Sequence, residues 1–299
     1  MALYVGLFLL SAATLALQVN LTRIFSVAQF YHFAFMAVSL ALLGFGASGT
    51  FLTLFPRLRG RDPARTLTVL CWGFALTAVG SYALTLYVPF DSFRIAHDWR
   101  QGLVLALHYL ALATPFFCSG TAAGLLLAVR PERANRTYAA NLTGSATGCL
   151  LAVVTPVLVG GEGTVLLCAA LGLLAALTFR SHASRITHHV LRFTQAALAL
   201  ALVLAALHLP AALAIRLSPY KSLSYALLYP DAELIFRRWN GFSRVDVVRS
   251  GSIRSLPGSG FNCPAAPPPQ LGLTVDGDDL SPISQVDPGF TALDFSDCL

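Results

Sequence analysis

Long stretches without charge alternate with short charged loops over the first 215 residues of the chain. Seven stretches contain no Asp, Glu, Lys or Arg. A helix needs about 20 apolar residues to cross a bilayer core, and all but the sixth stretch exceed that length. The pattern therefore predicts an all-α polytopic membrane bundle of about seven transmembrane helices. The stretches are residues 1–22, 24–56, 66–90, 101–129, 137–161, 163–179 and 193–215.

Residues 216–299 have a different pattern, with short segments that are typical of β-strands. Segments 233–239, 242–248 and 271–277 are rich in β-prone residues and are separated by turn residues. Asn240-Gly241, between the first two segments, is a strong hairpin signal. We therefore predict two domains, a transmembrane helical domain over residues 1–215 and a small β-rich soluble module over residues 216–299.

Composition and charge agree with a membrane protein. Of the 299 residues, 56% are hydrophobic and only 11% are charged, whereas a soluble domain carries about 25% charged residues. The net charge of +6 comes from basic residues in short loops, so it indicates topology rather than nucleic-acid binding. We expect a multi-pass protein of the cell (inner) membrane, with the lipid bilayer as a partner and no nucleic acid. The sequence leaves the oligomeric state open.

Arginine is distributed unequally between alternate loops. The loops after the second, fourth and sixth stretches hold ten Arg, and the other loops hold three. Because positively charged loops stay in the cytoplasm, we predict a cytoplasmic N-terminus. With seven spans, residues 216–299 then lie on the outer side. The ten are Arg57, Arg59, Arg61, Arg65, Arg130, Arg133, Arg136, Arg180, Arg185 and Arg192, and the three are Arg23, Arg94 and Arg100.

Four polar residues lie where the first stretch ends and the second begins: Gln18, Asn20, Arg23 and His32. Polar groups at membrane depth are costly and often functional, which makes these four a candidate intramembrane polar site. The structural alternative places Arg23 and His32 at the interface, with Gln18 and Asn20 bonded to a neighbouring helix. We identify no catalytic, cofactor-binding or metal-binding residue in the chain.

Gly44, Gly46 and Gly49 match the GxGxxG pattern of dinucleotide sites. Such a site needs a strand before the glycines and free backbone N–H groups, whereas these glycines lie inside a long apolar stretch. Small residues let membrane helices approach closely, so we predict that these glycines serve helix packing. The same role is predicted for Gly120, Gly124, Gly144 and Gly148.

Six segments form a recognisable set: 21–27 (LTRIFSV), 31–35 (YHFAF), 39–47 (SLALLGFGA), 218–224 (SPYKSLS), 244–248 (RVDVV) and 273–281 (LTVDGDDLS). The set resembles the opening of large bacterial membrane proteins of the spermidine synthase-like family. Those proteins join a multi-helix membrane domain, sometimes described as major-facilitator-like, to an aminopropyltransferase-type domain. The resemblance covers the amino-terminal portion of such a protein.

The resemblance implies aminopropyl transfer from decarboxylated S-adenosylmethionine, the co-substrate, to a polyamine. Two positions depart from the family pattern: Gln18 stands where related sequences often have Glu, and Leu280 where spermidine synthases tend to have a substrate-binding Gln. We expect the chain to be truncated before the Rossmann-like domain that holds the nucleoside. Catalysis by this chain alone, and a cofactor bound to it, are therefore not expected.

A second hypothesis rests on the polar residues of the helices. The helices would form a membrane carrier or binding protein for a polyamine or other small solute, with Gln18, Asn20 and Arg23 lining the path. A glycine-rich Rossmann segment encoded beyond codon 299 would support the first hypothesis. A genuine stop without such a segment would favour the second.

Overall fold

The computed structural model describes residues 2–60, 62–179, 185–254 and 268–286. The chain divides into two compact units. The first unit contains Met1–Ser26 and Tyr31–Arg216, and the second contains Leu217–Leu299 together with Val27–Phe30. The second unit therefore includes a short segment that the sequence pattern had placed among the membrane helices.

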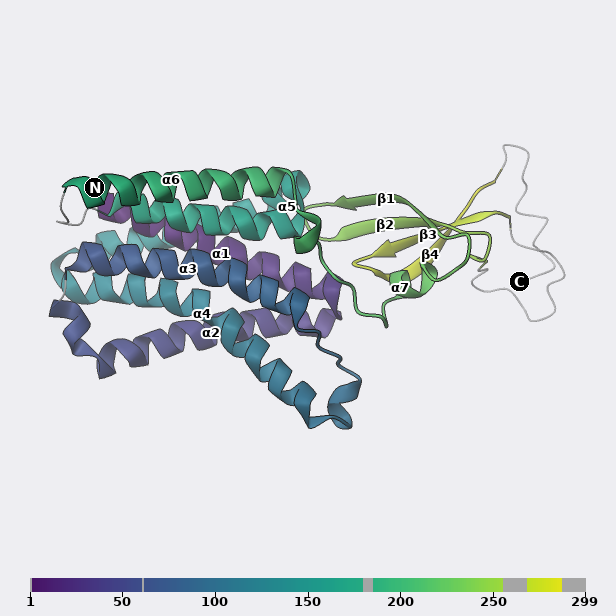
Figure 1. Ribbon diagram of the computed structural model, residues 1–299, viewed down its shortest axis with the longest axis horizontal. Helices are drawn as coiled ribbons and strands as arrows, with labels where there is room; N and C mark the ends of the chain where they lie inside the picture. The colour runs from purple at the N-terminus through teal and green to yellow at the C-terminus, as the bar shows by residue number, and fades with distance from the viewer. Residues whose placement is uncertain (1, 61, 180–184, 255–267, 287–299) are drawn as a thin grey trace. The chain divides into compact units, whose positions relative to one another are not determined.

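The first unit is a bundle of long helices that lie side by side (Figure 1). Within the described residues, six helices are long and apolar enough to cross a membrane. This result confirms the predicted class of fold, a multi-pass helical bundle followed by a small β module. The helices are α1 (Ala2–Ala28), α2 (Tyr31–Leu54), α3 (Pro63–Tyr87), α4 (Trp99–Val129), α5 (Ala134–Thr178) and α6 (Arg185–Leu207).

The difference between six helices and the seven predicted stretches lies in α5, which contains the fifth and sixth stretches. Gly160 breaks this helix with φ 76° and ψ 170°, a backbone conformation that essentially only glycine adopts. Beyond the break the chain folds back, as the contact between the Thr155 and Thr164 hydroxyl groups shows: their oxygens lie 3.1 Å apart. In a straight helix these two residues would be about 13 Å apart.

The packing of α1 shows the same hairpin. A Cβ added to Gly144 would touch the Phe8 carbonyl, and a Cβ added to Gly6 would touch the Thr178 side chain. Residues near the two ends of α5 therefore lie beside neighbouring turns of α1. The two halves of α5, about 39 Å and 27 Å long at 1.5 Å per residue, run antiparallel to each other.

Polar residues define the starts of two helices. The Asp62 carboxylate accepts a hydrogen bond from the Ala64 N–H at 3.0 Å, and Pro63 occupies the first turn of α3. The Asp98 carboxylate caps α4 in the same way, through the Arg100 N–H at 3.0 Å. Caps of this kind satisfy N–H groups that lack a partner inside the helix, so these short loops set the register of the apolar segments.

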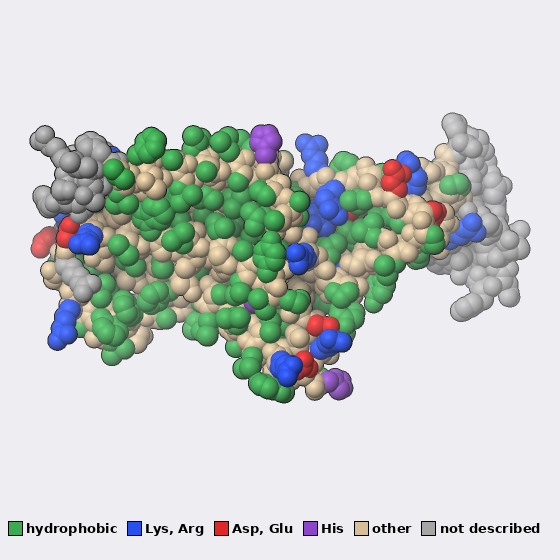
Figure 2. All heavy atoms as spheres, viewed as in Figure 1, with side chains coloured by type: hydrophobic (Ala, Val, Ile, Leu, Met, Phe, Trp, Pro, Cys, Tyr) green, Lys and Arg blue, Asp and Glu red, His purple; other side chains and the backbone are tan. Residues whose placement is uncertain are grey.

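Hydrophobic side chains cover the middle of the visible face of the helical unit, and charged side chains gather at its ends (Figure 2). Large apolar residues on the long helices are exposed, among them Phe35, Leu42, Leu110, Leu150 and Leu200. An exposed apolar surface of this extent is what a bilayer covers. Length, composition and surface together support a multi-pass membrane protein.

Glycine brings the helices close at most, but not all, of the predicted positions. A Cβ on Gly44 would collide with the backbone of α4, and one on Gly148 with the Ala12 carbonyl of α1. Gly120, Gly124 and Gly144 also leave too little space for a Cβ. The packing prediction is wrong for Gly46 and Gly49 within the described part of the chain, where a Cβ added to either glycine would have no atom within 4 Å. These two point away from the face of α2 that carries Gly44, because successive helical residues are rotated by about 100°.

The second unit is built on a four-stranded antiparallel sheet of order β1-β2-β3-β4. Its strands are β1 (Glu233–Trp239), β2 (Arg244–Arg249), β3 (Gln270–Val275) and β4 (Asp278–Ser284), and a short helix, α7 (Ser222–Ala226), precedes them. A small core of Leu223, Val248 and Ile253 joins helix and sheet.

The residues of both tight turns of the sheet suit their conformations. The Asn240 side-chain carbonyl accepts hydrogen bonds from the Phe242 and Ser243 N–H groups at 2.6 and 2.7 Å. Between β3 and β4, Asp276 and Gly277 have φ values of 52° and 73°, as the two central residues of a type I′ hairpin turn require. The sequence pattern had predicted three strands, and β4 is the fourth.

Candidate functional site at the break in α5

The four residues of the predicted polar site do not form one cluster. Asn20 is fully buried and Arg23 half-buried, and both donate hydrogen bonds to the backbone of α5. His32 is exposed at the start of α2, with its ring against Tyr31 and Phe33. Gln18 is half-buried on α1, and no hydrogen bond of its side chain is found within the described part of the chain. Only Asn20 and Arg23 therefore meet at α5.

Arg23 compensates for a proline in α5. Pro156 lies inside the helix and has no N–H, so the carbonyl four residues earlier, that of Ala152, loses its helical donor. The Arg23 guanidinium donates to that carbonyl. This contact gives Arg23 a structural role, since it bonds α1 to a neighbouring helix.

Asn20 bonds to the chain just beyond the break. Its Nδ2 donates to the Gly161 carbonyl at 2.7 Å. Its Oδ1 is buried and accepts no hydrogen bond from the described residues. A buried acceptor without a donor costs about 1–3 kcal/mol, so this atom marks a place where a donor from a ligand or a water molecule would be stabilising.

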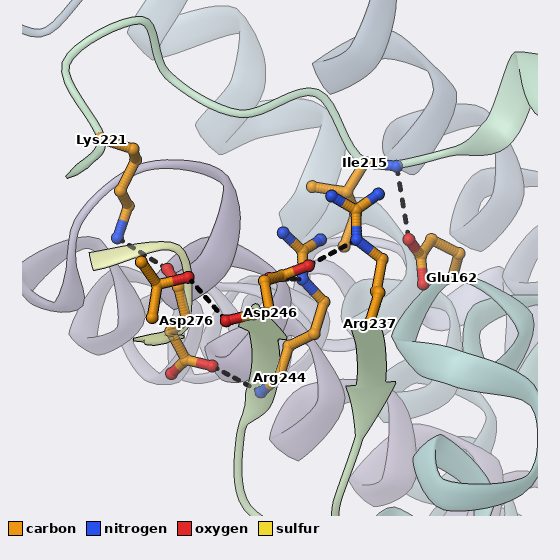
Figure 3. A network of polar contacts seen from close by, with 8 residues as sticks. Glu162, Ile215, Lys221, Arg237, Arg244, Asp246 and Asp276 are labelled. Atoms are coloured by element: carbon orange, nitrogen blue, oxygen red, sulfur yellow. Dashed lines mark hydrogen bonds and ion pairs between the residues drawn. The ribbon is translucent and has the colours of Figure 1, made fainter. Parts of the chain in front are cut away.

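Glu162 is the functional candidate that our sequence analysis missed. It follows the break by two residues and is 8% exposed. Its Oε1 accepts one long hydrogen bond, from the Ile215 N–H at 3.4 Å (Figure 3). Within the described residues it forms no ion pair. The signal was present in the sequence, since Glu162 is the charged residue that separates the fifth and sixth stretches.

The partner of Glu162 belongs to a segment that follows α6 and begins with a short 3₁₀ helix, Ala211–Leu213. Three contacts hold this segment against α3: the Tyr82 hydroxyl donates to the Leu213 carbonyl at 2.7 Å, the Tyr87 hydroxyl donates to the Ala212 carbonyl at 3.1 Å, and the Arg216 guanidinium lies 5.1 Å from the centre of the Tyr87 ring. The break in α5, Glu162 and the segment 211–216 thus share one end of the helical unit.

Further polar pairs tie α1 to its neighbours. The Ser11 hydroxyl donates to Asn141 at 2.8 Å, and the Thr14 hydroxyl donates to Ser119 at 2.6 Å. Hydrogen bonds of this kind hold membrane helices together. Because all four groups are paired with one another, we assign them to packing.

The second unit contains a separate polar network around Asp246. This carboxylate is fully buried and accepts from Arg237 Nε at 2.5 Å and Arg244 Nε at 2.8 Å (Figure 3). The Asp276 carboxylate accepts the Arg244 backbone N–H at 2.8 Å. Two arginines thus pair with one buried acid and link β1 to β2, and the backbone N–H of Arg244 adds the turn between β3 and β4.

Lys221 joins the β3–β4 turn to the start of α7. It is 2% exposed, donates to the Asp276 carbonyl at 3.0 Å and lies 3.3 Å from the Asp278 carboxylate. Burial lowers the pKa of Lys221 despite the nearby Asp278. Burial raises the pKa of Asp278, but the hydrogen bond from Ser222 and the charge of Lys221 outweigh it, so the net shift is downward. These contacts join segments 218–224 and 273–281, and the bond between Arg244 and Asp276 adds segment 244–248.

No group of three or more His, Cys, Asp or Glu that could hold a metal ion is found in the described part of the chain. Compared with known proteins, the chain matches no family model, no curated protein and no solved structure. The geometry of the two units therefore carries the functional argument.

Proposed function

We propose that the protein is a multi-pass membrane protein that binds a small organic amine, such as a polyamine, at Glu162. The observation that carries the proposal is a buried carboxyl group, at a helix break in a membrane bundle, without a counter-ion among the described residues. Burying an acid without a charged partner is costly, and buried acids in membrane domains often mark ion or solute sites.

A buried carboxyl group can be stabilised in two ways: it takes up a proton, or it pairs with a cation. The single N–H of Ile215, at 3.4 Å, supplies little of the hydrogen bonding that a carboxylate needs. Glu162 lies in the first turn after the break in α5. The start of a helix carries a partial positive charge, so this position favours the negatively charged form of Glu162. An ammonium group would bring both hydrogen bonds and the missing charge.

The neighbouring backbone favours an amine over a metal ion. A primary ammonium has three N–H donors. The carbonyls of Ala212 and Leu213 each accept one tyrosine hydroxyl, and a carbonyl oxygen has a second lone pair. By contrast, Ca²⁺ takes six to eight oxygen ligands and Mg²⁺ about six, whereas Glu162 is a single carboxylate.

Calorimetric titration of the purified full chain in detergent with spermidine, putrescine and propylamine tests the proposal. We expect saturable binding that weakens at least tenfold in Glu162→Gln, because a hydrogen bond to a charged group contributes about 1.5–3 kcal/mol. Glu132→Gln is the matched control, since Glu132 is exposed in the loop before α5. Absence of saturable binding, or equal affinity of Glu162→Gln, would show that the proposal is wrong.

The aminopropyltransferase-like hypothesis is the second candidate, and the network in the second unit favours it. Segments 218–224, 244–248 and 273–281 are far apart in the sequence, yet Lys221, Arg244 and Asp276 bond to one another or to a common partner. We propose that this unit is the small β module that precedes a Rossmann-like domain in such proteins. DNA sequence beyond codon 299 tests it: an encoded GxGxG segment after a strand supports the hypothesis, and a stop without one contradicts it.

A further inference from the structure

Glu162 lies near an arginine of the segment that follows α6, although the two charges do not pair. The N–H of Ile215 donates to Glu162 Oε1 at 3.4 Å, and Arg216 is the next residue. Because consecutive Cα atoms are about 3.8 Å apart, the Arg216 Cα lies at most about 9 Å from Glu162 Oε1. Within the described residues, no ion pair includes either side chain.

Tyr87 of α3 holds the arginine side chain. The Arg216 guanidinium lies 5.1 Å from the centre of the Tyr87 ring, and the Tyr87 hydroxyl donates to the Ala212 carbonyl at 3.1 Å. The face of an aromatic ring attracts a cation. Arg216 is exposed, so its guanidinium is accessible to a ligand. A guanidinium binds a carboxylate or a phosphate through two parallel N–H···O bonds.

The four other acids of the helical unit lie in its loops. Asp91 and Asp98 each accept a hydrogen bond from the backbone N–H two residues further on. Asp62 and Glu132 lie before α3 and α5, at the end of the bundle opposite to Glu162, because α3 and the first half of α5 each run the length of the bundle. On the segment that contacts Glu162, a second ammonium group would therefore meet Arg216, which repels it.

These charges match a ligand that carries one ammonium group and one anion. The ammonium group neutralises the buried Glu162 and the anion neutralises Arg216, so the bound ligand adds no net charge. That balance is favourable because an unpaired charge is costly where it is buried. A polyamine, by contrast, brings further positive charge to the neighbourhood of Arg216.

We propose that Glu162 and Arg216 together bind a zwitterion, whose ammonium group donates to Glu162 and whose carboxylate or phosphate accepts from Arg216. This inference rests on the proposed amine site at Glu162 and names the class of amine that the site takes. A free amino acid and the ethanolamine phosphate head group of a membrane lipid share this chemistry.

Calorimetric titration of the purified full chain in detergent compares each zwitterion with a partner that lacks only the anion. The pairs are glycine and its amide, β-alanine and its amide, 4-aminobutyrate and its amide, and O-phosphoethanolamine and ethanolamine. We expect one zwitterion to bind about three- to tenfold more tightly than its partner, a modest ratio because Arg216 is exposed.

The same titrations distinguish the two sources of the ligand. Tightest binding by an amino acid indicates a free solute. Tightest binding by O-phosphoethanolamine, together with phosphatidylethanolamine that co-purifies with the wild type and not with Glu162→Gln, indicates the lipid.

Two substitutions assign the two charges of the ligand. Arg216→Gln should bring the affinity ratio of the tightest pair to about one, whereas Glu162→Gln should weaken the binding of both members of that pair. Arg57→Gln is the matched control, since Arg57 is exposed between α2 and α3 and should keep the wild-type ratio.

The inference is overturned if no zwitterion binds more tightly than its partner, or if Arg216→Gln keeps the wild-type ratio. Failure of the proposed amine site gives a different result, because propylamine, which carries no anion, then shows no saturable binding or binds Glu162→Gln equally well. Saturable binding of propylamine with a ratio of about one for every pair would overturn the zwitterion alone.

Discussion

The Arg23 guanidinium donates to the Ala152 carbonyl, which is the carbonyl that Pro156 deprives of its helical partner. A charged side chain on α1 thereby completes the hydrogen bonding of a different helix. The contact gives a charged side chain between two apolar stretches a buried partner. It also fixes the position of α1 along the first half of α5, close to the break at Gly160 and to Glu162.

This relationship predicts a specific rescue. Arg23→Leu should destabilise the protein by about 1.5–3 kcal/mol, because a buried carbonyl loses its charged donor. In the Pro156→Ala background the backbone N–H of residue 156 returns, and Arg23→Leu should then cost less than about 1 kcal/mol. Unfolding in detergent, analysed as a double-mutant cycle, measures the coupling. If Arg23→Leu lowered the free energy of unfolding equally in both backgrounds, Arg23 and Pro156 would be independent.

Helix packing predicts opposite outcomes at two glycines. Gly144→Ala should lower the yield of folded protein, because the added methyl group would collide with the Phe8 carbonyl of α1. Gly46→Ala is the matched control: it has open space, and Ala is favoured over Gly in a helix by up to about 1 kcal/mol. Size-exclusion profiles of the two variants measure the effect. A loss of yield for Gly46→Ala alone would contradict the assignment of faces.

The hairpin in α5 predicts membrane sidedness. If both halves of α5 cross the bilayer, loops 55–62 and 130–133 lie in the cytoplasm and loop 88–98 and residue 216 lie outside. In a cysteine-free background, Phe93→Cys and Arg254→Cys should react with an impermeant maleimide in intact spheroplasts, and Glu132→Cys only after permeabilisation. Protection of Arg254→Cys alone would mean that one apolar segment does not cross.

Whether Arg254→Cys reacts or is protected also tests the aminopropyltransferase-like hypothesis. Adenosyl substrates are made inside the cell, so aminopropyl transfer requires residues 216–299 on the cytoplasmic side. The ten-to-three distribution of arginine favours the opposite side when seven segments cross. Reaction of Arg254→Cys in intact spheroplasts would therefore contradict the aminopropyltransferase-like hypothesis, whereas amine binding at Glu162 is compatible with either side.

The second unit should lose stability in acid through Asp278. Its folded pKa lies below the usual value of 3.8, so the folded state binds fewer protons than the unfolded state as the pH falls through that range. The stabilisation is complete above the unfolded pKa and is lost as the pH falls through the folded pKa. Proteolysis of the full chain between pH 6 and 2.5, using an acid-active protease, follows the effect.

Asp278→Asn should reduce this acid dependence, since the variant has no carboxyl group to protonate at that position. Asp279→Asn, whose side chain accepts none of the hydrogen bonds from Ser222 and Lys221, is the control and should behave as the wild type. An unchanged acid profile in Asp278→Asn would show that other carboxyl groups dominate.

The long helices could be predicted from sequence because each apolar stretch must be continuous to cross a bilayer. The same pattern placed the division between its fifth and sixth stretches within two residues of Gly160. It could not show that this division is a tight hairpin inside one helix, since a positive φ at a single glycine leaves no trace in hydrophobicity. The fourth strand was missed because Pro282 and two aspartates lower its β-propensity.

The polar site was harder to predict, because the partners of its residues are distant in the sequence. The role of Arg23 depends on Pro156, and that of Asn20 on Gly161, and both pairs form only when α1 packs against α5. Glu162 was read as a boundary between apolar stretches, although its burial makes it the more informative residue. Which glycines touch a neighbour depends on helix rotation, which the sequence does not specify.

Infrared difference spectroscopy of the purified chain, with and without saturating spermidine, tests amine binding at Glu162 most directly. Binding of an ammonium group to the carboxyl group should change a carboxyl or carboxylate band. The account predicts that this change is present in the wild type and in Glu132→Gln and absent in Glu162→Gln. A difference spectrum that persists unchanged in Glu162→Gln would contradict it.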